Sequence, residues 1–441
     1  MGRSRRKLSD QPFELDIESL DSKGLGCAEF EGRKLKVYDA LPEEKVIARN
    51  LFGRSQRGKV ETLEVIEASG DRVSPRCPHF GTCGACSLQH LSMDAQLKRK
   101  QRILLDTLNA SGQLSPGTIF EPLCGPEWNY RRKARLSVRD VAAKERVLVG
   151  FRERNGRFVA DMQTCHILRS EIADALPSLA ELVRSLDSRA TIPQIEVACG
   201  DEHSALIIRH LEPLTEPDVQ RLKVFAEQSG LAVFLQPKGP DSVCLLAPKD
   251  LQLEYRIDSL GLRFQFEPLD FLQINGGLNQ LMVNRALELL DPQADDNILD
   301  LFCGLGNFTL PLATRAGHVT GVEGSELMVA RARQNASLNG LENVDFHRAD
   351  LYQECSQAPW PGMAYNKVLL DPPRSGAEEL LPWIAGGTAQ KVLYISCNPQ
   401  TLARDAGILV NKYGFRLEGA GILDMFPHTP HSEAIALFER N

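Results

Sequence analysis

The sequence lacks any uncharged hydrophobic run of the ~18 residues that a membrane-spanning helix needs. It also lacks a secretory signal, because the basic residues of Met1–Asp10 are not followed by the apolar stretch of such a signal. The 11 cysteines are an odd number in a long chain without an export signal, which argues against a disulfide framework. We therefore expect a cytoplasmic protein with no membrane partner and no evident obligate protein partner, whose cysteines serve metal ligation or catalysis.

Length and composition are those of a soluble globular protein of two or three domains: 441 residues, 43% hydrophobic and 25% charged. The net charge of −7 is unevenly distributed along the chain. Residues 1–165 carry 29 basic and 22 acidic side chains, a balance of +7, and residues 166–441 carry 22 and 36, a balance of −14. The first part is suited to a polyanion such as nucleic acid, although an ordinary solvated face would carry similar charges.

Residues 12–69 predict a small all-β module, because short runs of strand-forming residues are separated by Gly, Pro and charged turns. The runs are Phe13–Ile17, Gly26–Phe30, Leu35–Tyr38, Lys45–Asn50 and Val60–Ile66. Lysines and arginines are scattered through them, which is typical of a five-stranded RNA-binding barrel. A barrel without a ligand would show a similar pattern.

A loop rich in Gly and Pro carries Cys77, Cys83 and Cys86 in a C-x5-C-x2-C arrangement. Three thiols this close in a reducing compartment favour a metal site. A fourth ligand must come from elsewhere, and Cys165 is the best placed by context. The wide first gap favours a structural iron–sulfur cluster over zinc, whose fingers prefer closer pairs, but the spacing leaves zinc open.

Two further segments carry basic residues. Residues 89–110 predict an amphipathic helix whose basic face includes Lys98–Arg102, and Trp128–Val138 predicts a strand with aromatic and basic side chains. Such a strand can follow a phosphate backbone and offer rings for base stacking, although charge also protects ordinary edge strands. Strand-like and helical runs without a motif fill residues 147–264, which predicts a central α+β region.

Strands and helices alternate in the C-terminal third, which predicts a doubly wound parallel α/β sheet. The expected strands are Asn297–Phe302, His318–Val322, Val344–His347, Lys367–Leu370 and Lys391–Ser396, followed by two more. The first strand runs into the glycine turn Asp300–Phe308, where a ligand can approach the backbone at a helix start. Glu323 ends the second strand, where a carboxylate can bind ribose hydroxyls.

The strand Lys391–Ser396 stops at a turn, which places Cys397 at the carboxyl end of the sheet, where open α/β folds bind their ligands. A lone cysteine is more often a small buried hydrophobe. A nicotinamide-dependent dehydrogenase is the first competitor, but its G-x-G-x-x-G signature fails because Thr309 replaces the third glycine. The turn together with Asp371-Pro-Pro-Arg374 resembles S-adenosylmethionine-dependent methyltransferases instead.

Over nearly its whole length the chain resembles the RNA (uracil-5-)-methyltransferase family. The resemblance rests on the four cysteines named above, Asp300–Phe308, Asp371–Gly376, Ser396–Pro399 and Asp424–Glu433. The N-terminal β module is similar to a TRAM domain. Together with the cysteines it points to the branch that acts on 23S ribosomal RNA rather than to the transfer-RNA branch.

The resemblance implies two cofactors. Cys77, Cys83, Cys86 and Cys165 would bind a [4Fe-4S] cluster, and S-adenosylmethionine would be bound by Gln273, Phe302, Asn307, Glu323, Asp350 and Asp371. Asp350 departs from the family pattern, which often has Asn there. The implied domains are an OB-like TRAM barrel in residues 1–70, a central α+β domain in 71–265 and a Rossmann-like methyltransferase domain in 266–441.

The chemistry of uracil methylation explains why a thiol and a base are needed. C5 becomes nucleophilic enough to attack a sulfonium methyl group only after a thiolate adds to C6, and we expect Cys397 to be that nucleophile. A base must then remove the C5 proton; Glu433 is the best candidate, with His428 and His431 as rivals. The uracil must also leave its stack, and RNA binding should weaken with salt.

Three other functions remain in view. The same chemistry could act on another ribosomal or transfer-RNA uridine. A non-catalytic RNA-binding iron–sulfur protein would leave Cys397 and Glu433 idle. A cytosine-5 methyltransferase also uses a cysteine, but the sequence has no Pro-Cys motif of that kind.

Overall fold

The computed structural model describes residues 11–51, 58–142, 145–154, 156–353 and 360–440, so the basic start Met1–Asp10 lies outside the described residues. The chain forms two compact units. The N-terminal unit comprises Met1–Lys98, Phe151–Ala160 and Pro427–Pro430, and the main unit comprises Arg99–Gly150, Asp161–Phe426 and His431–Asn441. Within the described ranges, no helix is both long and apolar enough to cross a membrane.

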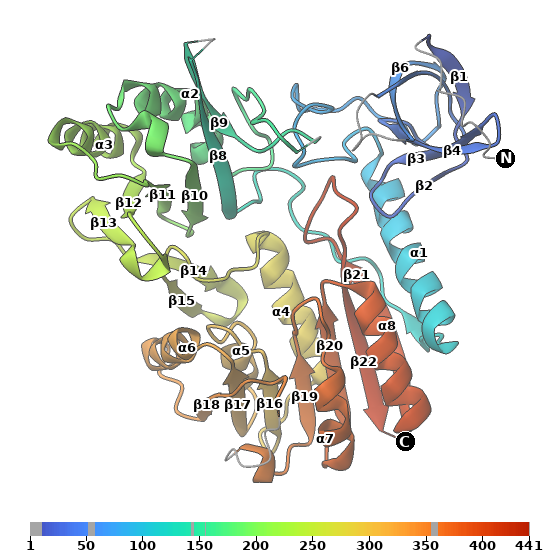
Figure 1. The fold of residues 1–441 in the computed structure, drawn as a ribbon. Helices are drawn as coiled ribbons and strands as arrows, with labels where there is room; N and C mark the ends of the chain where they lie inside the picture. Colours follow the sequence, from blue (N-terminus) through green and yellow to red (C-terminus); the bar gives the residue numbers. More distant parts are fainter. Residues whose placement is uncertain (1–10, 52–57, 143–144, 155, 354–359, 441) are drawn as a thin grey trace. The chain divides into compact units, whose positions relative to one another are not determined.

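The N-terminal unit contains a six-stranded sheet in the order β1-β5-β6-β4-β3-β2 (Figure 1). Its strands are β1 (Phe13–Asp16), β2 (Ser19–Leu20), β3 (Gly26–Phe30), β4 (Arg33–Tyr38), β5 (Lys45–Asn50) and β6 (Lys59–Glu67). Side chains alternate, so Leu35 and Val37 of β4 are buried while Lys34 is exposed. Five of these strands are predicted from the sequence, and β2 is too short for any pattern to reveal.

The central region of the main unit combines a sheet in the order β13-β12-β11-β10-β8-β9 with two helices, which confirms the α+β prediction. Its elements are β8 (Lys133–Val141), β9 (Arg146–Gly150), α2 (Ser170–Ser185), β10 (Gln194–Cys199), β11 (Ser204–Arg209), α3 (Glu216–Ser229), β12 (Ala232–Gln236) and β13 (Cys244–Ala247). The hairpin β14 (Leu253–Ile257) and β15 (Leu262–Phe266) follows. The predicted strand Trp128–Val138 begins only at Lys133, because Asn129 has a positive φ of 52° that interrupts extended backbone.

The C-terminal part of the main unit is an eight-stranded sheet in the order β18-β17-β16-β19-β20-β22-β21-β7 (Figure 1). Its strands are β7 (Thr118–Ile119), β16 (Asn297–Leu301), β17 (His318–Glu323), β18 (Val344–Arg348), β19 (Lys367–Leu370), β20 (Lys391–Ser396), β21 (Phe415–Leu423) and β22 (Glu433–Arg440). The five strands from β16 to β20 are parallel, which confirms the doubly wound sheet. The last strand, β22, is antiparallel to both β20 and β21.

Helices connect these strands and pack on them. They are α1 (Met93–Gly112), α4 (Gly276–Leu290), α5 (Thr309–Ala313), α6 (Glu326–Leu338), α7 (Leu381–Gly386) and α8 (Pro399–Gly407). Apolar residues of α4, α5 and α6 share one core with β16, β17 and β20. The helix α1 confirms the one predicted over residues 89–110.

The strand order reverses beside β16, because β17 and β18 lie on one side of it and β19 and β20 on the other. In open α/β sheets this reversal opens a ligand site at the carboxyl ends of the strands. The antiparallel strand β22 starts at the same edge, since Ser396 at the end of β20 pairs with Ala434. The fold therefore brings the residues that follow five parallel strands to one edge, together with Glu433.

Candidate active site

The turn after β20 presents Cys397 at the carboxyl edge of the sheet. The backbone N–H of Asn398 donates to the Ser396 hydroxyl at 3.1 Å, and the Asn398 side chain accepts from the N–H of Gln400 at 3.1 Å to cap α8. The Asn398 amide also donates to the carbonyl of Arg374 at 3.0 Å, which ties this turn to the Asp371–Arg374 loop. Cys397 is held half-buried at the end of this fixed turn.

Glu433 begins β22, next to Ala434, which pairs with the residue before Cys397. Its side chain is buried, at 7% exposure, and its Oε2 has no hydrogen-bond partner among the described residues. Burial, with a smaller effect of the Asp371 carboxylate, raises the pKa of Glu433 to about 8. A buried carboxyl with an open acceptor atom can take up a proton from a molecule bound at this edge.

The surroundings of Cys397 keep it a thiol in the unliganded chain. Burial raises the pKa of Cys397, and the negative charges of Glu433 and Asp371 raise it further, while the Arg374 guanidinium acts in the opposite direction. The Arg374 guanidinium thus favours the thiolate. A thiol and a base at neighbouring strand ends can together perform nucleophilic catalysis.

Asp371 follows β19 and lies at the centre of this edge. Burial raises its pKa to about 7. The amide of Gln273, from the segment before α4, donates to Asp371 Oδ2 at 3.4 Å. Two of the predicted cofactor residues that are distant in sequence are thereby brought into contact.

The glycine turn after β16 has the left-handed backbone that a close ligand approach requires. Phe302, Gly304 and Gly306 have φ values of 66°, 56° and 95°. Glu323, at the end of β17, accepts from the N–H of Gly304 at 3.2 Å and of Ser325 at 2.9 Å, so its carboxylate is fixed against the turn.

The first strand itself carries a buried acid beside this turn. Asp300 is fully buried and accepts a 2.5 Å hydrogen bond from the hydroxyl of Thr309, the residue that breaks the dehydrogenase signature. Burial raises the pKa of Asp300 to about 8. Thr309 therefore has a structural role here, because its hydroxyl donates to one oxygen of this buried acid and a glycine could not.

Asn307 is oriented by two residues that no motif marks. The hydroxyl of Tyr255 donates to Asn307 Oδ1 at 2.8 Å, and Asn279 and Asn307 exchange amide hydrogen bonds at 2.9 Å in both directions. The Arg132 guanidinium lies 5.5 Å from the ring centre of Tyr255 and pairs with Asp201 at 2.7 Å. In the sequence, only the apolar residues at alternate positions of β14 and the asparagines at 275, just before α4, and at 279 hint at them.

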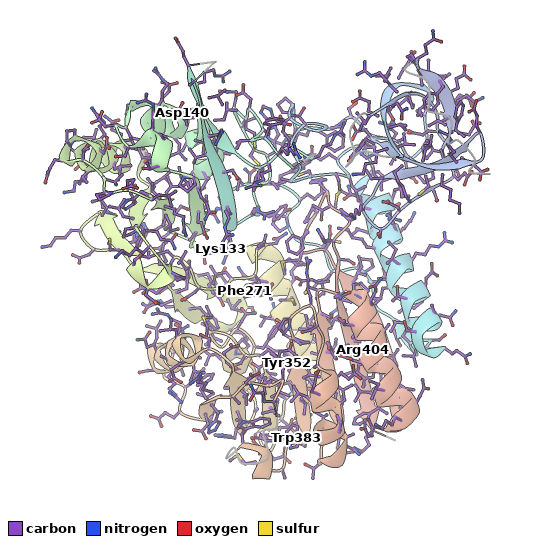
Figure 2. All side chains as sticks on the ribbon, in the orientation of Figure 1. Lys133, Asp140, Phe271, Tyr352, Trp383 and Arg404 are labelled. Atoms are coloured by element: carbon purple, nitrogen blue, oxygen red, sulfur yellow. The ribbon has the colours of Figure 1, made fainter. Side chains whose placement is uncertain are left out.

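Asp350, which follows β18, is the most exposed of the predicted cofactor residues. It accepts from the N–H of Tyr352 at 3.1 Å and from the amide of Gln353 at 2.7 Å. The ring of Tyr352, labelled in Figure 2, lies 5.9 Å from that of Phe302, and its hydroxyl is 2.7 Å from Ser375. The turns after β16, β18 and β19 are thus joined by side chains.

The two histidine rivals of Glu433 differ in their surroundings. The segment Pro427–Pro430 belongs to the N-terminal unit, where the His428 carbonyl accepts from the N–H groups of Ser87 and Leu88 at 3.0 and 2.9 Å. His431 belongs to the main unit, and burial together with nearby Arg374 lowers its pKa. His428 therefore belongs to the N-terminal unit, whereas His431 and Glu433 belong to the main unit.

A buried ion pair fixes the start of the segment that leads to Glu433. Lys100 Nζ of α1 lies 2.5 Å from Asp424 Oδ1 and donates to the carbonyl of Phe426 at 3.1 Å. Both charged side chains are almost fully buried. Burial lowers the pKa of Lys100, and Asp424 opposes this effect.

The predicted metal ligands are divided between the units. Cys77, Cys83 and Cys86 lie in a loop of the N-terminal unit, where the N–H of Cys83 donates to the carbonyl of His79 at 2.9 Å, and Cys165 is buried in the main unit. Across the described ranges, no group of three or more His, Cys, Asp or Glu side chains is arranged to hold a metal ion.

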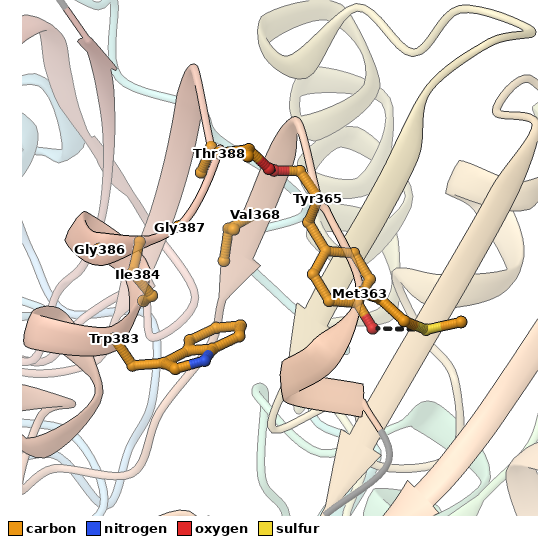
Figure 3. A pocket seen from close by; sticks show the side chains of 9 residues that line it. Met363, Tyr365, Val368, Trp383, Ile384, Gly386, Gly387 and Thr388 are labelled. Atoms are coloured by element: carbon orange, nitrogen blue, oxygen red, sulfur yellow. Dashed lines mark hydrogen bonds between the residues drawn. The ribbon is translucent and has the colours of Figure 1, made fainter. Parts of the chain in front are cut away.

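A cavity of about 270 Å³ lies near the amino ends of β19 and β20, away from the strand ends that carry Cys397 (Figure 3). Its lining includes Met363, Tyr365 and Trp383, and the Tyr365 hydroxyl donates to the sulfur of Met363 at 3.3 Å. None of the predicted site residues lines it.

The strand-order reversal, the glycine turn and the acid that ends β17 define a Rossmann-like domain with a ligand site at the carboxyl ends of its strands. The pattern of the family described as tRNA (Uracil-5-)-methyltransferase matches residues 203–441. The chain is 50% identical to a 23S rRNA (uracil(1939)-C(5))-methyltransferase RlmD of Hahella chejuensis and 47% identical to that of Alkalilimnicola ehrlichii. Each alignment covers 100% of this chain and 100% or 99% of the relative.

The chain therefore belongs to the RNA (uracil-5-)-methyltransferase family. Its fold is also that of a solved structure, the tRNA (uracil-54, C5)-methyltransferase of Pyrococcus abyssi in complex with S-adenosyl-L-homocysteine. The TM-score is 0.73 at 22% identity, and the match covers 96% of this chain and 99% of the other. At this identity the likeness concerns the fold alone.

Proposed function

We propose that the chain transfers the methyl group of S-adenosylmethionine to C5 of a uridine in 23S ribosomal RNA, the one that the relatives' name numbers 1939. The observation that carries the proposal is the Cys397 thiol beside the buried Glu433 carboxyl, whose Oε2 has no hydrogen-bond partner in the described part of the chain. Relatives of equal length, about half identical, carry this activity in their names.

The residues at the sheet edge fit S-adenosylmethionine. Phe302, Glu323, Asp350 and Asp371 end or follow four parallel strands, and Gln273 and Asn307 are each fixed by hydrogen bonds beside them. Fixed carboxylates and amides suit the polar groups of the cofactor, and the left-handed glycine turn admits it close to the backbone. When bound, S-adenosylmethionine supplies an electrophilic methyl group.

The thiol and the carboxylate divide the chemistry between them. The Cys397 thiol first loses its proton to solvent. The thiolate then adds to C6 of the uracil, the electron pair of the C5–C6 double bond moves to C5, and C5 takes the methyl group. The Glu433 carboxylate removes the remaining C5 proton. The electrons of that C–H bond restore the C5–C6 double bond, and the thiolate leaves. A pKa of about 8 makes Glu433 a stronger base than an ordinary glutamate.

The direct test is methyl transfer from labelled S-adenosylmethionine. We expect transfer to one uridine of 23S ribosomal RNA from cells that lack this chain, and little transfer to the same RNA from cells that contain it, since that site is already modified. Mapping the methylated base identifies the position. Preferential transfer to transfer RNA would contradict the proposed substrate, and the absence of transfer to any RNA would favour a non-catalytic RNA-binding protein.

We further propose that residues 1–70 form a TRAM-like RNA-binding domain, with a central domain in 71–265 and the methyltransferase domain in 266–441. The proposal for the first domain is supported by its strand-rich sheet and by the basic balance of residues 1–165. Salt should weaken RNA binding accordingly.

We also propose a [4Fe-4S] cluster on Cys77, Cys83, Cys86 and Cys165, supported by the chemistry of four thiol donors, three of them within ten residues. Anaerobically purified protein should contain about four iron atoms per chain. Elemental analysis and the visible absorption of the cluster check this, and Cys244→Ser, which changes an exposed cysteine elsewhere, should leave the iron content unchanged. One zinc per chain would overturn the assignment.

A further inference from the structure

The N-terminal unit contains a short hairpin, Phe151–Ala160, that carries an exposed aromatic ring. Arg152 and Val159 form an antiparallel bridge, and the N–H of Glu153 donates to the carbonyl of Phe158 at 2.9 Å. The side chain of Phe158 is nevertheless 69% exposed. We call this segment the Phe158 hairpin.

The Phe158 hairpin is held in place by backbone bonds to the cysteine loop of the same unit. The N–H of Gly84 donates to the carbonyl of Arg152 at 2.9 Å, and the N–H of Arg154 donates to the carbonyl of Thr82 at 3.0 Å. A Cβ at position 84 would lie 3.0 Å from the Arg152 carbonyl oxygen, so only glycine fits easily. Arg152 and Arg154 of the hairpin are thus both bonded through their backbone to the cysteine loop.

A side chain provides a second anchor. The Arg154 guanidinium pairs with Asp39 at 2.5 Å and lies 4.4 Å from the centre of the Tyr38 ring, at the end of β4. The charge of Arg154 is therefore already paired within the N-terminal unit. The other two arginines of the hairpin, Arg152 and Arg157, are exposed, and the described residues offer neither of them an ion pair.

A single exposed apolar residue is common on protein surfaces. Here the ring adjoins the exposed Arg157 on the same hairpin, in the part of the chain with a basic balance of +7. Aromatic rings stack on nucleic-acid bases regardless of sequence, while arginines bind the adjoining phosphates. The combination matches single-stranded RNA in both of its parts, the flat base and the anionic backbone.

We propose that the Phe158 hairpin is an RNA contact, in which Phe158 stacks on an unpaired base of the substrate RNA and the adjoining Arg157 binds a neighbouring phosphate. This inference rests on the proposed function, because it takes the substrate to be ribosomal RNA. It assigns to the hairpin a role in affinity and none in chemistry.

The test uses the full-length protein and a 23S ribosomal RNA fragment that contains the methylated uridine. Phe158→Ala should weaken RNA binding about tenfold or more and raise the KM for RNA with kcat unchanged, because one stacked base is lost. Phe158→Tyr should restore binding. Leu211→Ala, at a residue that is 59% exposed in the central region, is the matched control and should change neither value.

The salt dependence of RNA binding distinguishes the stacking of Phe158 from the phosphate contact of Arg157. Arg157→Ala should lower the slope of log affinity against log salt concentration by about one, whereas Phe158→Ala should leave that slope unchanged. An unchanged RNA affinity in Phe158→Ala would overturn the inference and leave the exposed ring to a protein contact. Failure of the wild-type chain to methylate any RNA would instead reject the proposed function, so the two failures are distinguishable.

Discussion

Replacing Cys397 by serine should abolish methyl transfer while the chain still binds RNA and S-adenosylmethionine. A serine hydroxyl fills the same place at the end of β20 but supplies no thiolate to add to C6, so C5 stays too weak a nucleophile. We expect a loss of at least about a thousandfold in turnover, as is found when a covalent nucleophile is removed. Steady-state transfer of labelled methyl groups measures it, and filter binding measures the RNA.

A trapping experiment sharpens this prediction. RNA with 5-fluorouridine at the target should form a covalent complex with the wild-type chain, because fluorine replaces the proton that the base must remove. Cys397→Ser should form none. Cys244→Ser, which alters an exposed cysteine outside the site, should behave like the wild type in both assays. Substantial turnover by Cys397→Ser would exclude the covalent route.

Replacing Glu433 by glutamine should let the reaction start but not finish. The amide keeps the shape and burial of the side chain and cannot accept the C5 proton, so the methylated adduct on Cys397 persists. A slowly migrating protein–RNA species should accumulate with unmodified RNA and S-adenosylmethionine. Glu439→Gln, at the far end of the same strand, where Glu439 pairs with Lys391 at 3.1 Å, is the control and should give no adduct.

The pH dependence of activity and of stability should follow from the raised pKa of Glu433. This value rises from an ordinary 4.5 to about 8 on burial, and the base acts in its charged form, so kcat/KM of the wild type should increase as pH rises towards 8. The contribution of this carboxyl to the free energy of unfolding changes in the opposite direction. It is fully present below about pH 4.5 and is lost as the pH rises through 8. Relative to the wild type, Glu433→Gln should therefore gain in melting temperature between pH 6 and pH 9. A fast, clean turnover by Glu433→Gln would assign the base to another group.

The chemistry-bearing residues could be predicted because they follow strands whose apolar runs are easy to recognise. Cys397, Asp371 and Glu323 each end such a run, and parallel pairing must bring strand ends to one edge. The direction of β22 is not encoded in any local pattern. Its start at Glu433 becomes meaningful only once its antiparallel pairing with β20 is known.

The residues that orient Asn307 could not be predicted for a different reason. Tyr255 lies 52 positions from Asn307 and Asn279 lies 28 away, and each looks like an ordinary buried or helical residue in its own segment. Their role depends on tertiary contact alone. The ion pair of Lys100 and Asp424 could not be predicted for the same reason. The two residues are 324 positions apart, and Lys100 lies in a helical segment whose pattern indicates only a basic face.

The position of Pro427–Pro430 within the N-terminal unit has a consequence for biosynthesis. The amide of His428 donates to the Gln96 side chain at 2.9 Å across 332 positions of sequence, so the N-terminal unit is complete only after Pro427–Pro430 has been translated. At a translation rate of ~5–20 residues per second, roughly 15 to 70 s pass between the synthesis of Gln96 and that of His428. A nascent chain that stalls before this point lacks both the Pro427–Pro430 part of the N-terminal unit and the strand β22 that begins at Glu433, so a single interruption causes both defects.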